Sequence, residues 1–167
     1  PQDEESQAEL LHLAAVPKQI ISPANNQAIV GIFQDSLLGA HRFTRDSVKF
    51  DIRTAMNLLM YFDNPQMDKI KKKKKISGFD LLSQIMPPLS LKFKNSLFSS
   101  EEKSNESNNI IEIVNGEYKR GSLDKGSLGS MSKGFLQRIY NDFSYKHSEN
   151  FIDNLQAIVT EYMLSLI

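Results

Sequence analysis

An amide and a carboxylate stand side by side directly after an apolar segment near the start of the chain. The segment Ala28–Phe33 has the composition of a buried strand, and Gln34 and Asp35 follow it. An amide donates and accepts hydrogen bonds and a carboxylate accepts them, so the pair has the chemistry to bind a polar ligand. The structural alternative is that Asp35 caps a helical turn at residues 36–39 while Gln34 bonds to the backbone. The residues alone favour this structural interpretation.

Five consecutive lysines, Lys71–Lys75, form the densest charge in the sequence. The whole chain is neutral, with 20 basic and 20 acidic residues, but positions 61–100 hold eight lysines against three aspartates. Such a cluster is typical of polyanion-binding or nuclear-import segments, and equally of a solvated loop. Because no aromatic residue interleaves with the lysines to stack on bases, we favour the solvated loop.

A glycine- and serine-rich segment, 121–134, contains four glycines and Lys125. A P-loop needs a Lys-Ser/Thr pair at the start of the following helix, and that pair is missing. The three histidines are far apart, there is no cysteine, and neither a Ser/His/Asp order nor a pair of catalytic carboxylates is present. The residues therefore predict neither a metal centre, nor a disulfide, nor a catalytic apparatus.

The hydrophobic pattern predicts an α+β fold of short strands and hairpins with peripheral helices. Helices are expected at Glu4–Leu13, Leu37–Ala40 (a short turn), Asp51–Tyr61 (capped by Asp51), Ser77–Ile85, Gly134–Tyr140 and Ser148–Leu166. Strands are expected at Lys18–Ser22, Ala28–Phe33, Leu89–Phe93, Ile110–Val114 and Glu117–Gly121. The first two strands should form a hairpin around the turn at 23–26, and the last two around Asn115-Gly116.

Two low-complexity insertions, at about 64–76 and 95–109, are expected to be surface loops that the core does not need. Their polar composition cannot offset the cost of ordering, roughly 1–2 kcal/mol per residue. Shortening the segment Asn95–Asn109 should therefore leave the melting temperature nearly unchanged. Ser122–Lys133 is expected to be a further loop, rich in glycine and serine.

Several motifs resemble the largest subunit of multisubunit DNA-dependent RNA polymerases, above all those of eukaryotic RNA polymerase II and of large DNA viruses. The specific matches are residues 1–10 (PQDEESQAEL), 15–17 (AVP), 19–23 (QIISP) and 31–39 (GIFQDSLLG), with looser ones at 77–78, 86–87 and 113–116. The resemblance implies that residues 1–167 are the pore region, a fragment that follows the catalytic aspartate loop and lines the secondary channel. Nucleotides enter and backtracked RNA leaves by that channel.

The resemblance also implies roles for single residues. Those that it places on the channel wall, near the RNA 3′ end, are Asn26, Gln34, Asp35 and Lys125. The chain departs from RNA polymerase II at Gln27 and Gly126, where that enzyme has lysines. Fewer positive charges weaken the attraction for RNA phosphates, so weak RNA binding is expected of the chain alone.

The intact enzyme of this resemblance transfers nucleotidyl groups with two Mg²⁺ ions held by aspartates. Those aspartates would precede Pro1, so we expect a piece of a longer protein that holds no cofactor and is inactive alone. The expected partners are other polymerase subunits, especially the second-largest, the nascent or backtracked RNA 3′ end, NTPs in transit and a transcript-cleavage factor. The expected location is the nucleus for a eukaryotic chain, or the viral factory or virion for a viral one.

Two further expectations concern partners outside a polymerase. No membrane partner is expected, because the N-terminus is polar and no apolar run approaches the ~20 residues of a membrane span. The alternative to a polymerase fragment is a stand-alone interaction module that binds a polyanion through Lys71–Lys75. A coding sequence for an aspartate loop upstream of Pro1 would decide between the two.

Overall fold

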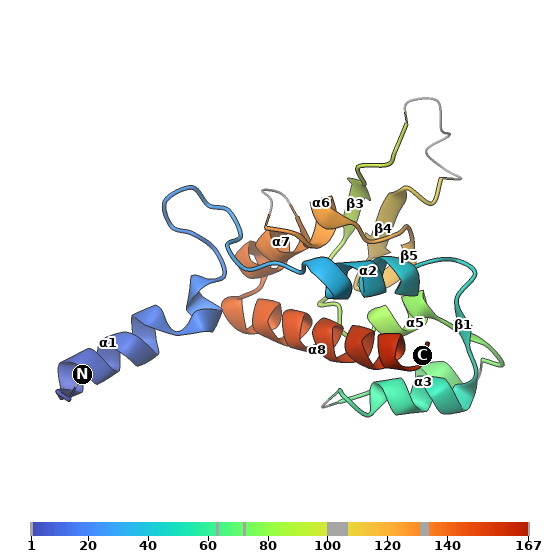
Figure 1. Cartoon of the computed structure of the whole chain (residues 1–167), viewed down its shortest axis with the longest axis horizontal. Coiled ribbons are helices and arrows are strands. Elements are labelled where there is room, and N and C mark those ends of the chain that lie inside the picture. Colours follow the sequence, from blue (N-terminus) through green and yellow to red (C-terminus); the bar gives the residue numbers. More distant parts are fainter. Residues whose placement is uncertain (1, 63, 72, 100–106, 131–133, 167) are drawn as a thin grey trace.

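A computed structural model describes residues 2–62, 64–71, 73–99, 107–130 and 134–166 of the chain. Two helices, α2 (Gln34–Phe43) and α8 (Tyr145–Leu164), pack on each other at the centre of the molecule. An antiparallel sheet of order β3-β4-β5 lies to one side of them (Figure 1). This arrangement confirms the α+β prediction.

The other elements are short and surround this centre. In chain order they are α1 (Glu4–Glu9), continued by a π-helical turn (Leu10–Ala14) and a 3₁₀ turn (Val16–Gln19), then β1 (Lys49–Phe50), α3 (Ile52–Leu59), α4 (Asp68–Lys71), β2 (Ile76–Ser77), α5 (Gly78–Leu82), β3 (Leu91–Lys94), β4 (Ile110–Val114), β5 (Glu117–Arg120), α6 (Lys125–Leu128) and α7 (Phe135–Asp142). Strands β1 and β2 form a separate two-stranded ladder.

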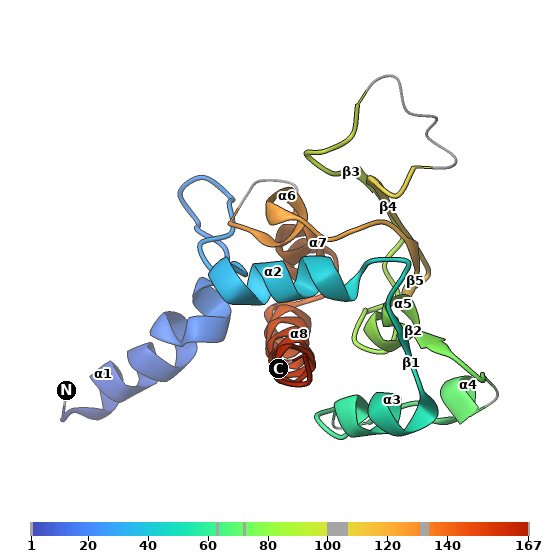
Figure 2. The same cartoon turned by 45° about the vertical axis from the view of Figure 1, so that its right-hand side comes forward.

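The core is apolar and continuous from α2 to α8 and under the sheet. Its largest fully buried side chains include Phe43 of α2, Phe135 of α7 and Phe151 of α8. Helix α2 approaches α8 closely because Gly39 has no side chain: a Cβ at this position would lie 2.4 Å from Val159 Cγ1. Figure 2, which looks nearly along α8, shows α2 lying directly over it.

Where the expected elements carried a local signal, the structure confirms them. Asp51 caps α3, since its carboxylate accepts a hydrogen bond from the Thr54 N–H at 3.2 Å. The turn between β4 and β5 has positive φ at Asn115 (49°) and Gly116 (79°), as a two-residue hairpin requires. The hairpin therefore forms where the sequence predicts it: β4 has the expected bounds, and β5 ends one residue earlier than expected.

The expected first hairpin forms only at its turn, because the two segments pair at Ile21 and Ala28 and not along full strands. Residues 16–19 form a 3₁₀ turn with a proline at its start, and the ladder is reduced to one bridge between Ile21 and Ala28. Downstream, the Ile32 N–H donates to the Leu128 carbonyl at 2.9 Å. A partner almost 100 residues away in sequence therefore replaces the neighbouring strand, and local alternation could not predict it.

Two expected loops contain packed elements. Within the segment 64–76, α4 and β2 bury Ile70 (1% exposed) and Ile76 (0%). In the segment 95–109, Asn95 is buried and its side chain donates to Ser122 Oγ at 3.2 Å. The prediction that residues 64–76 are a surface loop outside the core is therefore wrong. The effect of shortening 95–109 stays a prediction, because residues 100–106 lie outside the described residues.

The N-terminal helical segment extends away from the rest of the molecule, confirming the expected helix at 4–13 (Figures 1 and 2). Its apolar side chains Leu10, Leu11 and Leu13 are about half to two-thirds exposed. A surface of this kind is normally covered by another protein segment. Across the described ranges, no helix combines the length and apolar character needed to cross a membrane.

Candidate functional site

Two of the four residues singled out from the sequence line one groove between α2 and α6. The groove has a volume of about 350 Å³, and Gln34 and Lys125 lie on it together with His41. The remaining lining residues are Leu37, Leu38, Leu123 and Asp124. Leucine side chains therefore supply an apolar wall, and an amide, an imidazole and an ammonium group supply the polar rim.

Four side chains of helix α2 line the groove because the helical repeat places them on one face. Gln34, Leu37, Leu38 and His41 have the spacing i, i+3, i+4 and i+7, which places them on one helical face. Gln34 is exposed and has a left-handed backbone, with φ of 50°. A glutamine in this region is uncommon and costs on the order of 1–3 kcal/mol, which is a feature of functional positions.

The far end of α2 holds the segment that precedes α6. The Leu123 N–H donates to Thr44 Oγ1 at 3.0 Å, and the Leu123 carbonyl lies 2.9 Å from His41 Nδ1. A carbonyl only accepts hydrogen bonds, so Nδ1 of His41 is the donor in this contact. These two contacts fix the separation between the walls of the groove.

Asp124 fixes the start of α6 and therefore the position of Lys125. Its carboxylate accepts from the Ser127 N–H at 2.9 Å, and from the Ser96 N–H at 2.8 Å and Oγ at 2.9 Å. Asp124 is 8% exposed. Burial raises the pKa of this carboxyl, but the hydrogen bonds from Ser96 and Ser127 outweigh burial and hold the pKa below its ordinary value.

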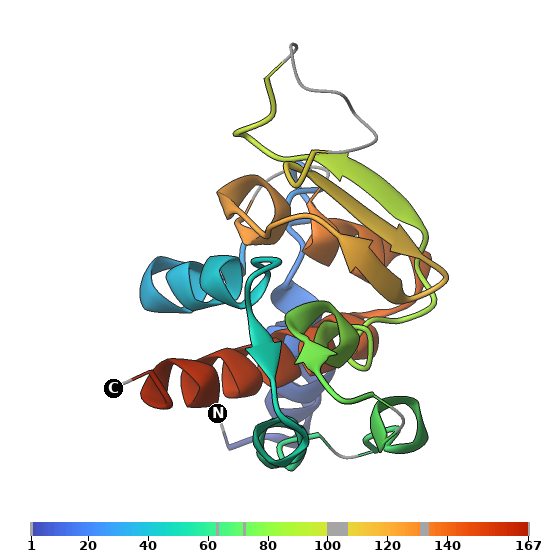
Figure 3. The ribbon, with the colours of Figure 1, turned by 90° about the vertical axis from the view of Figure 1, so that its right-hand side faces the viewer.

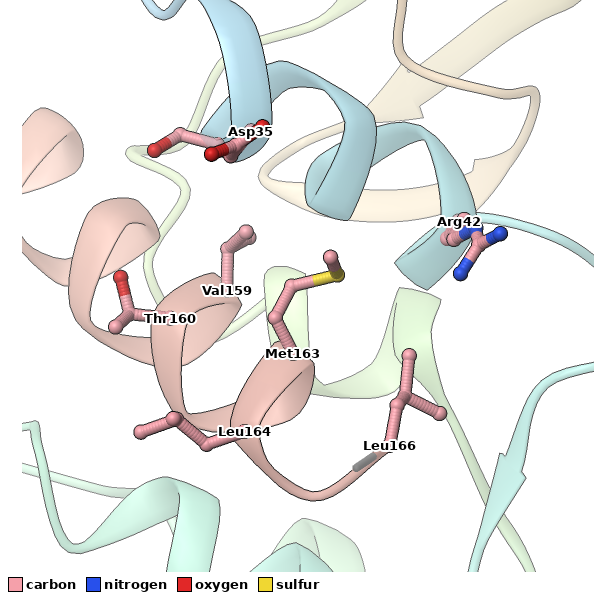
Figure 4. Close-up of a pocket in the computed structure, with 8 residues that line it drawn as sticks. Asp35, Arg42, Val159, Thr160, Met163, Leu164 and Leu166 are labelled. Carbon is pink, nitrogen blue, oxygen red and sulfur yellow. The ribbon is translucent and has the colours of Figure 1, made fainter.

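Asp35 faces a different hollow from its neighbour Gln34. It lines an open cleft of about 400 Å³ between α2 and the C-terminal end of α8, with Arg42 and Met163 (Figure 4). Helix α2 begins after Phe33 without a side-chain cap, and Asp35 lies inside the first turn. The capping interpretation of Asp35 is therefore wrong, although a carboxylate in a first turn still favours the helix dipole.

Asn26 lies apart from both hollows. It occupies an exposed turn with φ of 51°, and its backbone carbonyl accepts a hydrogen bond from Gln137 Nε2 at 2.5 Å. It lines a third hollow, which includes Lys18 and Tyr140. The fold therefore groups Gln34 with Lys125 and separates Asp35 and Asn26 from them.

Sequence reasoning missed His41 as a member of the groove. A helix of ten residues instead of the expected short turn would have placed His41 two turns after Gln34, on the same face. Thr44 and Ser96, which position the groove from outside, carry no sequence signal of this kind. They act through partners 79 and 28 residues away.

The described residues offer no cluster of three histidine, aspartate or glutamate side chains that could hold a metal ion. The carboxylates nearest to the groove do not change this conclusion. The carboxylate oxygens of Asp124 accept hydrogen bonds from backbone N–H and hydroxyl groups, and Asp35 lies in the other cleft. These residues do not fit a catalytic Mg²⁺ site.

Comparisons with known proteins identify the family of the chain. The chain is 28% identical over 164 residues to "DNA-directed RNA polymerase subunit 1" of Acanthamoeba polyphaga mimivirus, a match that covers 98% of the chain and 10% of the viral protein. The chain thus spans about a tenth of this relative's length. The sequence profile of the family described as RNA polymerase Rpb1, domain 3, matches residues 19–165. The chain therefore belongs to this family, a domain of the largest RNA polymerase subunit.

Proposed function

We propose that residues 1–167 form the pore region of an RNA polymerase largest subunit and line its secondary channel. The observation that carries this proposal is the groove shared by Gln34 and Lys125, two residues that the polymerase motifs single out independently. Family membership supports the setting, since the chain is a domain of the largest subunit.

The groove suits the extruded 3′ end of an RNA. Its leucine wall can pack against a base, while the amide of Gln34 hydrogen-bonds base edges or ribose hydroxyls whatever the sequence. The ammonium group of Lys125 is a point charge on a flexible side chain, so it can attract a phosphate in many orientations. The strained backbone of Gln34 supports this role, because a glycine would satisfy the fold with less strain.

The other two candidate residues extend the proposed wall. Asp35 in the α2–α8 cleft can orient basic groups of a neighbouring subunit. Asn26 presents an amide from an exposed turn. Both are exposed, so they are available to ligands or to other subunits. The proposed partners are the second-largest subunit, the RNA 3′ end, NTPs and a transcript-cleavage factor.

In the assembled enzyme, nucleotidyl transfer would depend on carboxylates and Mg²⁺ supplied from outside residues 1–167. The chain contributes positions along the path of nucleotides and RNA and no reacting group. We therefore propose that it has no polymerase activity alone.

Gln34→Gly and Lys125→Gln, made in the assembled polymerase, should each slow cleavage of backtracked transcripts by about 2- to 10-fold. The range corresponds to one lost hydrogen bond of about 0.5–1.5 kcal/mol. Gln34→Gly should leave the melting temperature of the chain unchanged or slightly higher, because glycine relieves the left-handed strain. Lys146→Gln, at an exposed lysine in the first turn of α8, serves as the control. Normal cleavage with both variants would refute the channel role.

Asp35→Asn should leave folding intact while it alters pausing or transcript cleavage. The carboxylate is exposed and makes no capping bond, so the fold loses little when its charge is removed. Pausing assays on the assembled enzyme and thermal melting of the chain test the two halves separately. A lower melting temperature with unchanged pausing and cleavage would return Asp35 to a structural role.

A further inference from the structure

Three lysines from two segments that are distant in sequence line one groove on the surface near α4. Lys69 and Lys73 come from α4 and the residues after it, and Lys119 comes from β5. We call this hollow, which has a volume of about 420 Å³, the lysine groove. It shares no residue with the groove of Gln34 and Lys125. Helix α5, which contributes Phe79 and Asp80 to the groove, packs against β5 (Figure 3).

The wall that carries the lysine run is anchored at both ends. Ile70 and Ile76 are buried in the core on either side of the run. Immediately after it, Ser77 and Asp80 form a capping box: Ser77 N–H donates to Asp80 Oδ2 at 3.0 Å, and Asp80 N–H donates to Ser77 Oγ. A run of five lysines would be expected to be solvated and mobile, but these anchors hold both of its ends at one place on the surface.

The positive charge of the groove exceeds the negative charge that lines it. Lys73 Nζ pairs with Asp80 Oδ1 at 2.6 Å, and Lys119 pairs with Glu117. The hydrogen bond and charge of the Lys119 ammonium lower the pKa of Glu117, and the charges of Lys69 and Lys73 lower it further. Lys69, which lines the groove, has no ion-pair partner among the described residues, and neither do the exposed Lys71, Lys74 and Lys75 next to the groove.

The fold also brings aromatic rings to the lysines, although none interleaves with them in the sequence. Phe79 and Tyr118 both line the groove, stacked on each other with ring centroids 5.3 Å apart and planes 8° apart. The position of the Tyr118 ring is fixed by its buried hydroxyl, which donates a hydrogen bond to the Gly121 carbonyl at 2.8 Å. Phe79 is half-buried and lines the groove, so part of its ring is available to a ligand there, close to the lysines.

We propose that the lysine groove binds the phosphate backbone of a single-stranded nucleic acid without regard to base sequence. Lysines on both walls neutralise successive phosphates, and the aromatic surface of Phe79 accepts an unstacked base, which together are the two elements of such sites. An acidic peptide would use the charge but would gain nothing from the aromatic surface. The proposal holds whether or not the groove of Gln34 and Lys125 faces a channel.

The test is a binding titration of the 167-residue chain with fluorescent oligouridylate and oligothymidylate dodecamers across a salt series. Replacing Lys69 and Lys119 by glutamine should weaken binding roughly ten-fold or more at about 50 mM salt and reduce the salt slope by about 1.4, because each phosphate contact to a single strand contributes about 0.7. Both side chains are exposed, so the variant should melt like the parent chain. In the assembled polymerase, a photocrosslinker at position 79 should label RNA or single-stranded DNA.

The matched control replaces Lys94 and Lys146, two exposed lysines outside the groove, by glutamine. It removes the same charge and should change affinity less than about two-fold. Equal losses in the two double variants would overturn the proposal, because binding would then follow net charge. A labelled polyglutamate dodecapeptide that binds as tightly as the oligouridylate, with the same dependence on Lys69 and Lys119, would also overturn it in favour of an acidic protein partner.

Discussion

Gly78→Ala should destabilise the folded chain by about 3 kcal/mol, at the upper end of the range for overpacked cores. Gly78 is buried at the start of α5, and a Cβ at this position would lie 2.1 Å from the Phe43 carbonyl oxygen. That oxygen belongs to the backbone of α2, so a side-chain rotation cannot relieve the clash. The methyl group must push α2 and α5 apart.

The separation would spread through the aromatic cluster at the end of α2. Phe43 is fully buried, and its ring centroid lies 5.4 Å from that of Phe50 and 5.2 Å from that of Tyr162. For a chain of this length, a loss of about 3 kcal/mol corresponds to a fall of about 6–12 °C in the melting temperature. Thermal melting followed by circular dichroism measures this change directly.

Gly126→Ala provides a matched control for the effect of the glycine itself. A Cβ on Gly126 would meet Asp124 Oδ2 at 3.4 Å, an ordinary contact, and Gly126 already lies in α6. Alanine should therefore be neutral or stabilising by about 0.4–1 kcal/mol through the unfolded state. Similar melting temperatures for Gly78→Ala and the parent chain would show that α5 is free to shift and would contradict the packing argument.

The elements that can be predicted well from the sequence are those whose signals lie within a few residues. Asp51 caps α3 through Thr54, and Asn115-Gly116 supplies the two positive φ angles of its hairpin. In each of these cases the partner of the signal is a near neighbour in the chain. Local propensity then agrees with the final fold, and the prediction succeeds.

The elements that failed depend on partners far along the chain. Residues 28–33 look like a strand, but Ile32 bonds to Leu128 at the end of α6. The composition of Lys71–Lys75 predicts a free solvated loop, but the buried Ile70 and Ile76 tie its ends to the core. Periodicity within a short window cannot report such contacts.

The candidate site was predictable only in part for the same reason. The resemblance to polymerases singled out Gln34 and Lys125 as site residues, but no local pattern indicated that α2 and α6 form the two walls of one groove. That arrangement depends on Thr44 and His41, which hold both polar groups of the Leu123 peptide. Residues that position a site are harder to find than residues that line it, because their chemistry is directed at the backbone.

Asp124→Ala should destabilise the chain by about 3 kcal/mol at neutral pH. The substitution removes the N-terminal cap of α6 and leaves Ser96 and Ser127 N–H groups without their charged acceptor, and caps and charge-assisted bonds each contribute about 1–3 kcal/mol. Because the Asp124 carboxylate joins the segment after β3 to α6, Lys125 should lose its fixed position as well. Transcript cleavage by the assembled enzyme should then fall together with stability.

The pH dependence of this loss follows from the lowered pKa of Asp124. A carboxyl whose pKa is lower in the folded state stabilises the fold fully above its unfolded pKa of about 3.9, and this contribution disappears as the pH falls through the folded value. The difference in unfolding free energy between the parent chain and Asp124→Ala should therefore be greatest near pH 6–7. It should narrow below about pH 4, in urea titrations measured at each pH.

Two control variants test whether the cost of Asp124→Ala comes from its hydrogen bonds to Ser96 and Ser127 and not from the loss of a carboxylate as such. Asp153→Ala, at an exposed position of α8, should change stability by less than about 0.5 kcal/mol at every pH. Ser96→Ala removes only one of the three bonds to Asp124 and should cost about a third as much as Asp124→Ala, because the Ser96 N–H and the α6 cap remain. If the cost of Asp124→Ala did not change between pH 7 and pH 3, the hydrogen bonds to the ionised carboxylate could not be its source. The burial of Asp124 would then reflect packing alone, and the position of Lys125 would have to depend on the contacts of Leu123 with α2.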